Sequence, residues 1–96
     1  MLQTRGYALA PKALIESPTQ ILYMYREDPD GIYDTGWRFF SGSETDEYVN
    51  NPDNIGLYDI LTIVAKYPYV RDYLTLPPGS AVERNDQFSD FIISKL

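Results

Sequence analysis

The chain has 96 residues, of which 44% are hydrophobic and 15% aromatic. A chain of this length can bury roughly two-thirds of the surface that it exposes when unfolded, so we expect one domain over residues 1–96. Cysteine and histidine are both absent. Their absence excludes disulfides, thiolate chemistry and histidine-based triads, and it removes the ligands that zinc sites prefer.

The net charge of the chain is −6. An acidic chain repels phosphate backbones, so we expect no binding to nucleic acid. No segment has the pattern of a signal peptide or the roughly 20 apolar residues of a membrane span, so we expect a cytoplasmic protein without a membrane partner.

Residues 6–10 alternate weakly as a strand does, and residues 12–16 fit one helical turn after Pro11. Residues 20–26 are apolar at successive positions, which predicts a central strand covered on both faces. Residues 37–41 predict the next strand, with Trp37 and Phe39 on one face and Arg38 and Phe40 on the other. We expect these last two strands to form an antiparallel hairpin.

Carboxylates follow Ser43 directly, which predicts a short helix over residues 43–49 with the serine as its cap. Residues 55–67 fit both a strand and a helix, and we favour a helix capped by Asp59 that runs to about Lys66. A further helical turn is predicted for residues 69–74, and a hairpin of two strands for residues 80–84 and 88–93. The sequence therefore predicts a single α+β domain, with a mainly antiparallel sheet of about five strands and two or three short helices packed on one side.

Acidic residues concentrate in the middle of the chain. Residues 27–59 hold nine acidic residues and one basic residue, a net charge of −8, whereas the rest holds seven basic and five acidic residues, a net charge of +2. A solvated surface is the plainer explanation, and a face that attracts a basic protein is the functional one. The candidate partner-binding residues are Asp28, Asp30, Tyr33, Asp46, Glu47 and Tyr48.

A second candidate site is a small-ligand pocket formed by Tyr25, Trp37 and Arg38. We expect Arg38 itself to pair with a nearby carboxylate, which is a structural role unless the pair lines a cleft. The carboxylates Asp28, Asp30 and Asp34 resemble a calcium loop in spacing, but the glycine and the bidentate glutamate are misplaced. A metal-dependent hydrolase built on paired carboxylates stays a third possibility, and we favour no catalytic residue, no metal and no cofactor.

Three strings of the sequence resemble a family of small bacterial proteins. They are YMYREDP at residues 23–29, DTGWRFFSG at residues 34–42, and NPDNIG at residues 51–56, with further similarity at residues 58–63 and 78–84. Over roughly residues 6–93 the chain is similar to the immunity protein 33 family.

This resemblance implies a non-enzymatic, cytoplasmic immunity protein of a polymorphic toxin system, which binds and neutralises a cognate toxin. Taken with the acidic segment, it leads us to expect a basic toxin, such as a nuclease. A stand-alone small-ligand or accessory domain is the alternative. The sequence leaves the oligomeric state open.

Overall fold

The computed structural model describes residues 6–17 and 19–96, so the first five residues of the predicted domain lie outside the described part. The strands are β1 (Tyr7–Pro11), β2 (Tyr23–Arg26), β3 (Asp34–Phe40), β4 (Ile55–Asp59), β5 (Ser80–Glu83) and β6 (Ile92–Lys95). The helices are α1 (Lys12–Glu16), α2 (Asp46–Asn50) and α3 (Ile60–Lys66), and η1 (Pro52–Asn54) and η2 (Pro68–Tyr73) are 3₁₀ helices.

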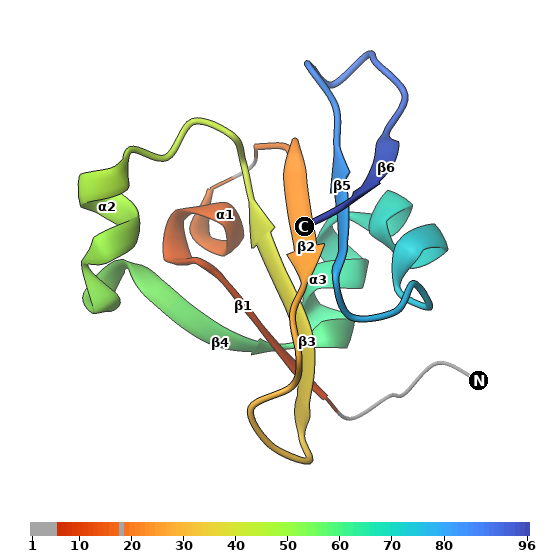
Figure 1. Cartoon of the computed structure of the whole chain (residues 1–96). Helices are drawn as coiled ribbons and strands as arrows, with labels where there is room; N and C mark the ends of the chain where they lie inside the picture. The colour runs from red at the N-terminus through yellow and green to blue at the C-terminus, as the bar shows by residue number, and fades with distance from the viewer. Residues whose placement is uncertain (1–5, 18) are drawn as a thin grey trace.

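The six strands form one sheet in the order β4-β1-β3-β2-β5-β6 (Figure 1). The neighbouring strands β1 and β3 are parallel, and every other neighbouring pair is antiparallel. The predicted α+β domain with a mainly antiparallel sheet is therefore confirmed. The predicted hairpin of β2 and β3 is also confirmed, and β2 lies inside the sheet as expected.

One face of the sheet, here called the core face, carries the hydrophobic core. Met24, Trp37, Phe39 and Val82 are all buried on it, because residues paired across strands point to the same side. Leu14 of α1 and apolar residues of α3 and η2 complete the same buried cluster. Helices α1 and α3 thus cover this face as predicted, whereas α2 lies on the other side of the sheet, and Figure 1 shows α3 behind the strands.

Polar groups of the core are tied to backbone atoms. The indole nitrogen of Trp37 donates to the carbonyl oxygen of Leu74 at 3.2 Å. The hydroxyl of Tyr67 donates to the carbonyl oxygen of Leu14, which joins α1 to the start of η2. Buried tyrosine and tryptophan need such partners, because an unpaired polar group in an apolar core is costly.

Both patterns found in residues 55–67 occur in the structure, one after the other. Residues Ile55–Asp59 form the edge strand β4, and α3 begins directly after it. The carboxylate of Asp59 accepts a hydrogen bond from the backbone nitrogen of Leu61 at 2.8 Å, so the predicted cap is confirmed. The strand was missed as a separate element because its alternation continues into the helical pattern without a break.

Several predicted boundaries were wrong. Strand β2 begins at Tyr23 rather than at residue 20, and β3 begins at Asp34 rather than at residue 37. The cap of α2 is Thr45, whose hydroxyl accepts from the backbone nitrogen of Tyr48, whereas Ser43 bonds within the preceding loop. Strand β6 begins at Ile92, later than the predicted residue 88, because Asp86 organises a turn by accepting from the backbone nitrogen of Phe88 and the hydroxyl of Ser89.

The other face of the sheet, here called the open face, is only partly covered. Strand β2 was expected to be covered on both faces, but Tyr23 and Tyr25 on the open face are half-buried, in contrast to the fully buried Met24 between them. The helix α2 lies beside this face, at the left of Figure 1.

Candidate binding site

Three aromatic rings form the centre of the open face. Tyr23 and Tyr25 come from β2 and Phe40 from β3, where Phe40 is paired with Tyr23 in the sheet register. The ring centroids of Tyr25 and Phe40 are 6.0 Å apart with planes inclined by 10°, and those of Tyr23 and Phe40 are 6.2 Å apart. Offset stacking of this kind stabilises aromatic groups beyond the area that they bury. The open face therefore presents a rigid aromatic floor.

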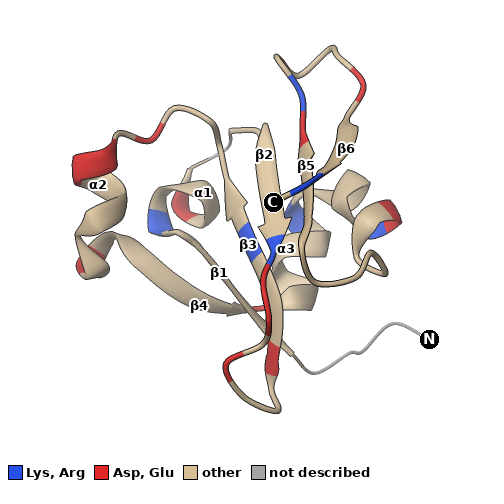
Figure 2. Cartoon of the chain, in the orientation of Figure 1, with Lys and Arg blue, Asp and Glu red and all other residues tan. Residues whose placement is uncertain are grey.

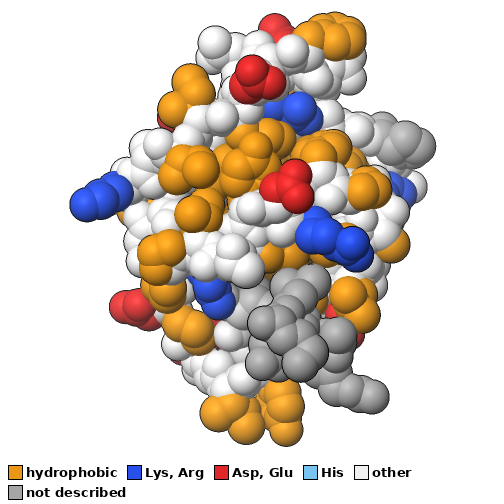
Figure 3. Space-filling view, turned by 90° about the vertical axis from the view of Figure 1, so that its right-hand side faces the viewer, with side chains coloured by type: hydrophobic (Ala, Val, Ile, Leu, Met, Phe, Trp, Pro, Cys, Tyr) orange, Lys and Arg blue, Asp and Glu red, His pale blue; other side chains and the backbone are white. Residues whose placement is uncertain are grey.

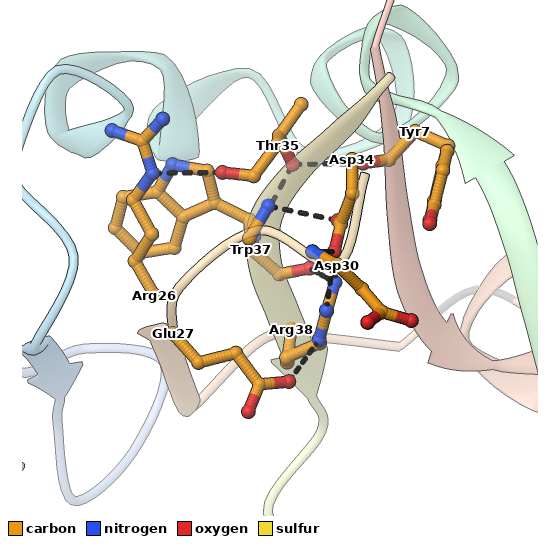
Figure 4. A network of polar contacts seen from close by, with 9 residues as sticks. Tyr7, Arg26, Glu27, Asp30, Asp34, Thr35, Trp37 and Arg38 are labelled. Atoms are coloured by element: carbon orange, nitrogen blue, oxygen red, sulfur yellow. Dashed lines mark hydrogen bonds and ion pairs between the residues drawn. The ribbon is translucent and has the colours of Figure 1, made fainter. Parts of the chain in front are cut away.

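Beside these rings lies an ion network built on Arg38 (Figure 4). Both carboxylate oxygens of Asp34 accept from its guanidinium, at 2.9 and 2.8 Å. Nε of Arg38 donates to Oε2 of Glu27 at 2.6 Å. Arg38 and Asp34 are each only 5% exposed, whereas the Glu27 side chain is 48% exposed. The expected pairing of Arg38 with a carboxylate is confirmed, and the network has one solvent-facing member.

Asp34 also holds the loop between β2 and β3. Its carboxylate accepts from the backbone nitrogens of Asp30, at 2.9 Å, and of Gly36, at 2.8 Å. The hydrogen bonds from Arg38 hold the pKa of Asp34 well below its ordinary value, although burial acts in the opposite direction. The same pairing raises the pKa of Arg38. Both groups are therefore charged over the whole physiological pH range.

The open face is hollowed where α2 approaches the rings. One hollow of about 400 Å³ has a floor of Tyr23, Tyr25 and Phe40 and a rim that includes Glu44 and Asp46. A smaller hollow of about 170 Å³ adjoins it and shares Tyr25, Phe40 and Val49 with the larger one. Glu27 and Arg38 are its charged lining residues, and Leu9, Ala10 and Ile55 are the others. Aromatic walls with a few charged groups are typical of recognition sites.

The predicted partner-binding residues lie in two separate groups. Asp46, Glu47 and Tyr48 lie on α2, where both acids are exposed and the tyrosine is half-buried. Asp28, Asp30 and Tyr33 are exposed in the loop between β2 and β3, at the bottom of Figure 2.

The strand β3 separates these two groups, because the loop precedes it and α2 follows it. Its seven residues span roughly 20 Å at about 3.3 Å per residue. The two groups therefore do not form one cluster, and the aromatic floor lies between them.

The predicted pocket residues are divided by the sheet. Tyr25 and Arg38 are paired across β2 and β3 and line the smaller hollow together. Trp37 points to the core face and is 1% exposed, so it does not share that hollow. Alternation along β3 separates the neighbours Trp37 and Arg38, so the predicted pocket of Tyr25, Trp37 and Arg38 was wrong in its inclusion of Trp37.

Tyr23, Glu27, Phe40 and Val49 line the hollows and were not among the predicted site residues. Tyr23, Glu27 and Phe40 could have been found from the alternation of β2 and β3. This alternation places Tyr23 and Phe40 beside Tyr25 on one face, and Glu27 continues that face two residues after Tyr25. Val49 carries no comparable signal, since its position depends on how α2 folds back over the sheet.

Within residues 6–17 and 19–96, no group of three or more acidic side chains is arranged to hold a metal ion. In the same residues, no helix has the length and apolar character needed to cross a membrane. The groups that the candidate site offers to a partner are aromatic rings and carboxylates.

Comparison with protein families gives one match: the Immunity protein Imm33 domain family matches residues 8–93. The match covers most of the chain, so the chain belongs to this family, as the resemblance indicated. Membership suggests an immunity protein role and a non-enzymatic one. Searches of curated proteins and of solved structures found no match.

Proposed function

We propose that this protein is an immunity protein that binds a cognate bacterial toxin through the open face of its sheet and neutralises it. The toxin is a basic protein, such as a nuclease, and the immunity protein acts in the cytoplasm without catalysis. Family membership supports the immunity role, and the charge of the open-face rim supports the basic character of the partner.

The observation that carries this proposal is the hollow of about 400 Å³ with an aromatic floor and an acidic rim. Tyrosine and phenylalanine supply large contact areas at a small entropic cost, and buried aromatic anchors dominate the energy of protein interfaces. Acidic groups around them attract a basic partner and exclude acidic ones.

The size of the open face fits one protein partner. The molecule measures 31 × 30 × 25 Å, and a standard interface buries about 800 Å² on each side. An interface of that size covers most of the open face, including α2 and the loop between β2 and β3. The two groups of acidic residues can therefore contact one partner at opposite ends of the aromatic floor.

Co-expression with a candidate cognate toxin tests the function. Cells that produce the toxin together with this protein are expected to grow, whereas cells that produce the toxin alone are expected to die. Equal death with and without the protein would contradict the immunity role.

Charge reversal tests the surface. The double variant Asp46→Lys/Glu47→Lys is expected to bind the purified toxin at least about tenfold more weakly. Its matched control is Asp72→Lys/Asp90→Lys, which changes the net charge equally at exposed positions outside α2 and the hollows. Both variants should unfold at the wild-type denaturant concentration. Unchanged affinity of the first variant would contradict the proposed surface but not the immunity role.

A second candidate function is the binding of a small ligand. A separate hollow of about 450 Å³ lies where α1 meets the loop before α2, and this volume is typical of small-ligand sites. Its polar lining residues are Ser17, Thr19, Ser41, Ser43, Glu44, Thr45 and Tyr48. A thermal-shift screen against metabolites tests this candidate, because a ligand that binds only the folded state raises the unfolding temperature.

A further inference from the structure

Among the described residues, the ion network under the open face carries one uncompensated negative charge. Arg38 is hydrogen-bonded to two carboxylates, those of Asp34 and Glu27. Asp34 is fully engaged, since both of its oxygens accept from Arg38 and from backbone nitrogens. Two carboxylates and one guanidinium sum to one excess negative charge, and it resides at Glu27.

Glu27 uses only one of its two oxygens within the described residues. Oε2 accepts from Arg38, whereas Oε1 accepts no hydrogen bond from any described donor. Figure 4 shows that this second oxygen points away from Arg38 and Asp34. A carboxylate of this kind can accept a second cationic donor without losing its first.

The hollow of about 170 Å³ in front of Glu27 has room for one side chain and is smaller than typical cofactor sites. Leu9, Val49 and Ile55 supply aliphatic walls, which suit the methylene groups of a long side chain. Tyr25 and Phe40 supply ring surfaces near the charged end, which suit a cation. The uncompensated charge and the apolar walls are independent features, and both match one kind of occupant.

We propose that this hollow is a socket for a basic side chain of the partner protein, with arginine preferred over lysine. The guanidinium lies against the rings of Tyr25 and Phe40 and donates to Oε1 of Glu27. Arginine is preferred because its planar head stacks on rings and donates in a fixed fork, whereas the ammonium of lysine is compact and strongly hydrated. The proposal rests on the proposed function and names the chemistry of its central contact.

Small probes test the socket without any toxin. N-acetyl-arginine methylamide is titrated into the ¹⁵N-labelled protein, with the lysine and norleucine analogues in parallel. The arginine probe is expected to bind in the millimolar range and to shift the amide resonances of Tyr25, Phe40 and Val49. The lysine probe should bind more weakly, and the norleucine probe at least about fivefold more weakly, because it lacks the charge.

Variants of the socket test whether arginine binding depends on the charge of Glu27 and on the open volume of the hollow. Glu27→Gln retains an oxygen that accepts from Arg38 but removes the excess charge, and it is expected to weaken arginine binding at least about fivefold. Asp53→Asn removes the same charge at an exposed position that does not line the hollow, and it should leave binding unchanged. Val49→Phe fills the hollow from α2 and should abolish binding of all three probes.

Three results would overturn the socket: equal binding of norleucine and arginine, wild-type arginine binding by Glu27→Gln, or shifts confined to other parts of the sheet. These results are independent of the co-expression experiment. Survival of the toxin-producing cells together with absent arginine binding would leave the immunity role in place and remove the socket alone. Death of the cells together with specific arginine binding would contradict the immunity role and leave the socket in place.

Discussion

Arg38 joins the β2–β3 loop to the open face of the sheet, because it pairs with Asp34 and Glu27 and lines the smaller hollow. Its guanidinium is buried and donates four hydrogen bonds, two to Asp34, one to Glu27 and one to the carbonyl oxygen of Trp37. Removal of one member of such a network leaves a buried charge without its partner. The free-energy cost of that charge exceeds the stabilisation that the complete network provides.

Replacement of Arg38 should therefore destabilise the fold. The variant Arg38→Met keeps much of the side-chain volume but leaves Asp34 buried without its counter-ion, so we expect unfolding to become easier by about 3–5 kcal/mol. Urea unfolding measures this change. The exposed Arg71 provides the control, and Arg71→Met should change stability by less than about 0.5 kcal/mol. Equal effects of the two variants would show that the network contributes nothing.

The acid side of the pH profile should report Asp34. Its pKa is lower in the folded protein than in the unfolded chain, so its contribution to stability is present above about pH 4 and is lost as the pH falls further. The variant Asp34→Asn lacks this contribution at every pH. The stability difference between wild type and variant should thus be largest near pH 7 and should shrink between pH 4 and pH 2. Urea unfolding at these pH values measures it, and a constant difference would contradict the assignment.

At the scale of single elements, the hairpin of β2 and β3 depends on Gly36. This residue has a φ of +85°, and a side chain there would collide with the carbonyl oxygen of Glu27. The backbone of Gly36 also pairs with Glu27, whose nitrogen donates to its carbonyl oxygen at 3.0 Å. The close approach positions Glu27 beside Arg38.

The variant Gly36→Ala should destabilise the protein by at least roughly 1–3 kcal/mol, because alanine is strained at positive φ and would also push Glu27 away. Gly31, in the loop that precedes β3, is the matched control, since it has no positive φ and no atom lies within 4 Å of where its Cβ would be. Gly31→Ala should change stability by no more than about 0.5 kcal/mol. Thermal or urea unfolding of both variants distinguishes them, and similar losses would refute this role of Gly36.

Elements with local signals could be predicted from the sequence. The cap at Asp59, the hairpin of β2 and β3 and the inward position of Trp37 and Phe39 all follow from neighbouring residues. The parallel pairing of β1 with β3 could not be predicted, because it joins residues such as Tyr7 and Asp34 that have no local relation. For the same reason, the sequence could name a carboxylate partner for Arg38 but could not identify Asp34 and Glu27, which lie on either side of the loop.

The candidate site was predicted only in its parts. The acids of α2 and of the loop were identified by charge, but their separation along β3 depends on the fold. The aromatic floor depends on which strands are neighbours, and the hollows depend on the return of α2 across the sheet. Cavities arise from the packing of distant segments, and a single sequence contains no direct signal for them.

At the scale of the whole molecule, charge and apolar surface are distributed differently. Acidic residues occur on α2 and on the loop between β2 and β3, at the two ends of the open face (Figure 2). Hydrophobic side chains reach the surface on the side of β6 (Figure 3), where Phe88, Ile92, Ile93 and Leu96 are all more than half exposed. The open face therefore has an acidic rim that can steer a basic partner, whereas the β6 side carries charges of both signs among its apolar side chains (Figure 3).

Association with the toxin should accordingly depend on salt. Steering by the acidic rim acts through solvent, where charges are screened over about 10 Å at 0.1 M salt. We expect the association rate constant to fall about tenfold between 50 and 500 mM NaCl, with a much smaller change in the dissociation rate constant. Stopped-flow or surface binding kinetics measure both. The association rate constant of the variant Asp46→Asn/Glu47→Gln should depend less on salt. An association rate constant of the wild type that is independent of salt would contradict steering.

The strand order has a consequence for synthesis of the protein. Strand β1 lies between β3 and β4, and both follow it in the sequence. The ribosome needs roughly 3–10 seconds to add the residues from β1 to the end of β4, at about 5–20 residues per second. During that time the β2–β3 hairpin can already pair, whereas β1 has no complete set of neighbours. Strand β1 therefore gains its second neighbour only when β4 has left the ribosome, and the core is closed only when β5, which carries Val82, has followed.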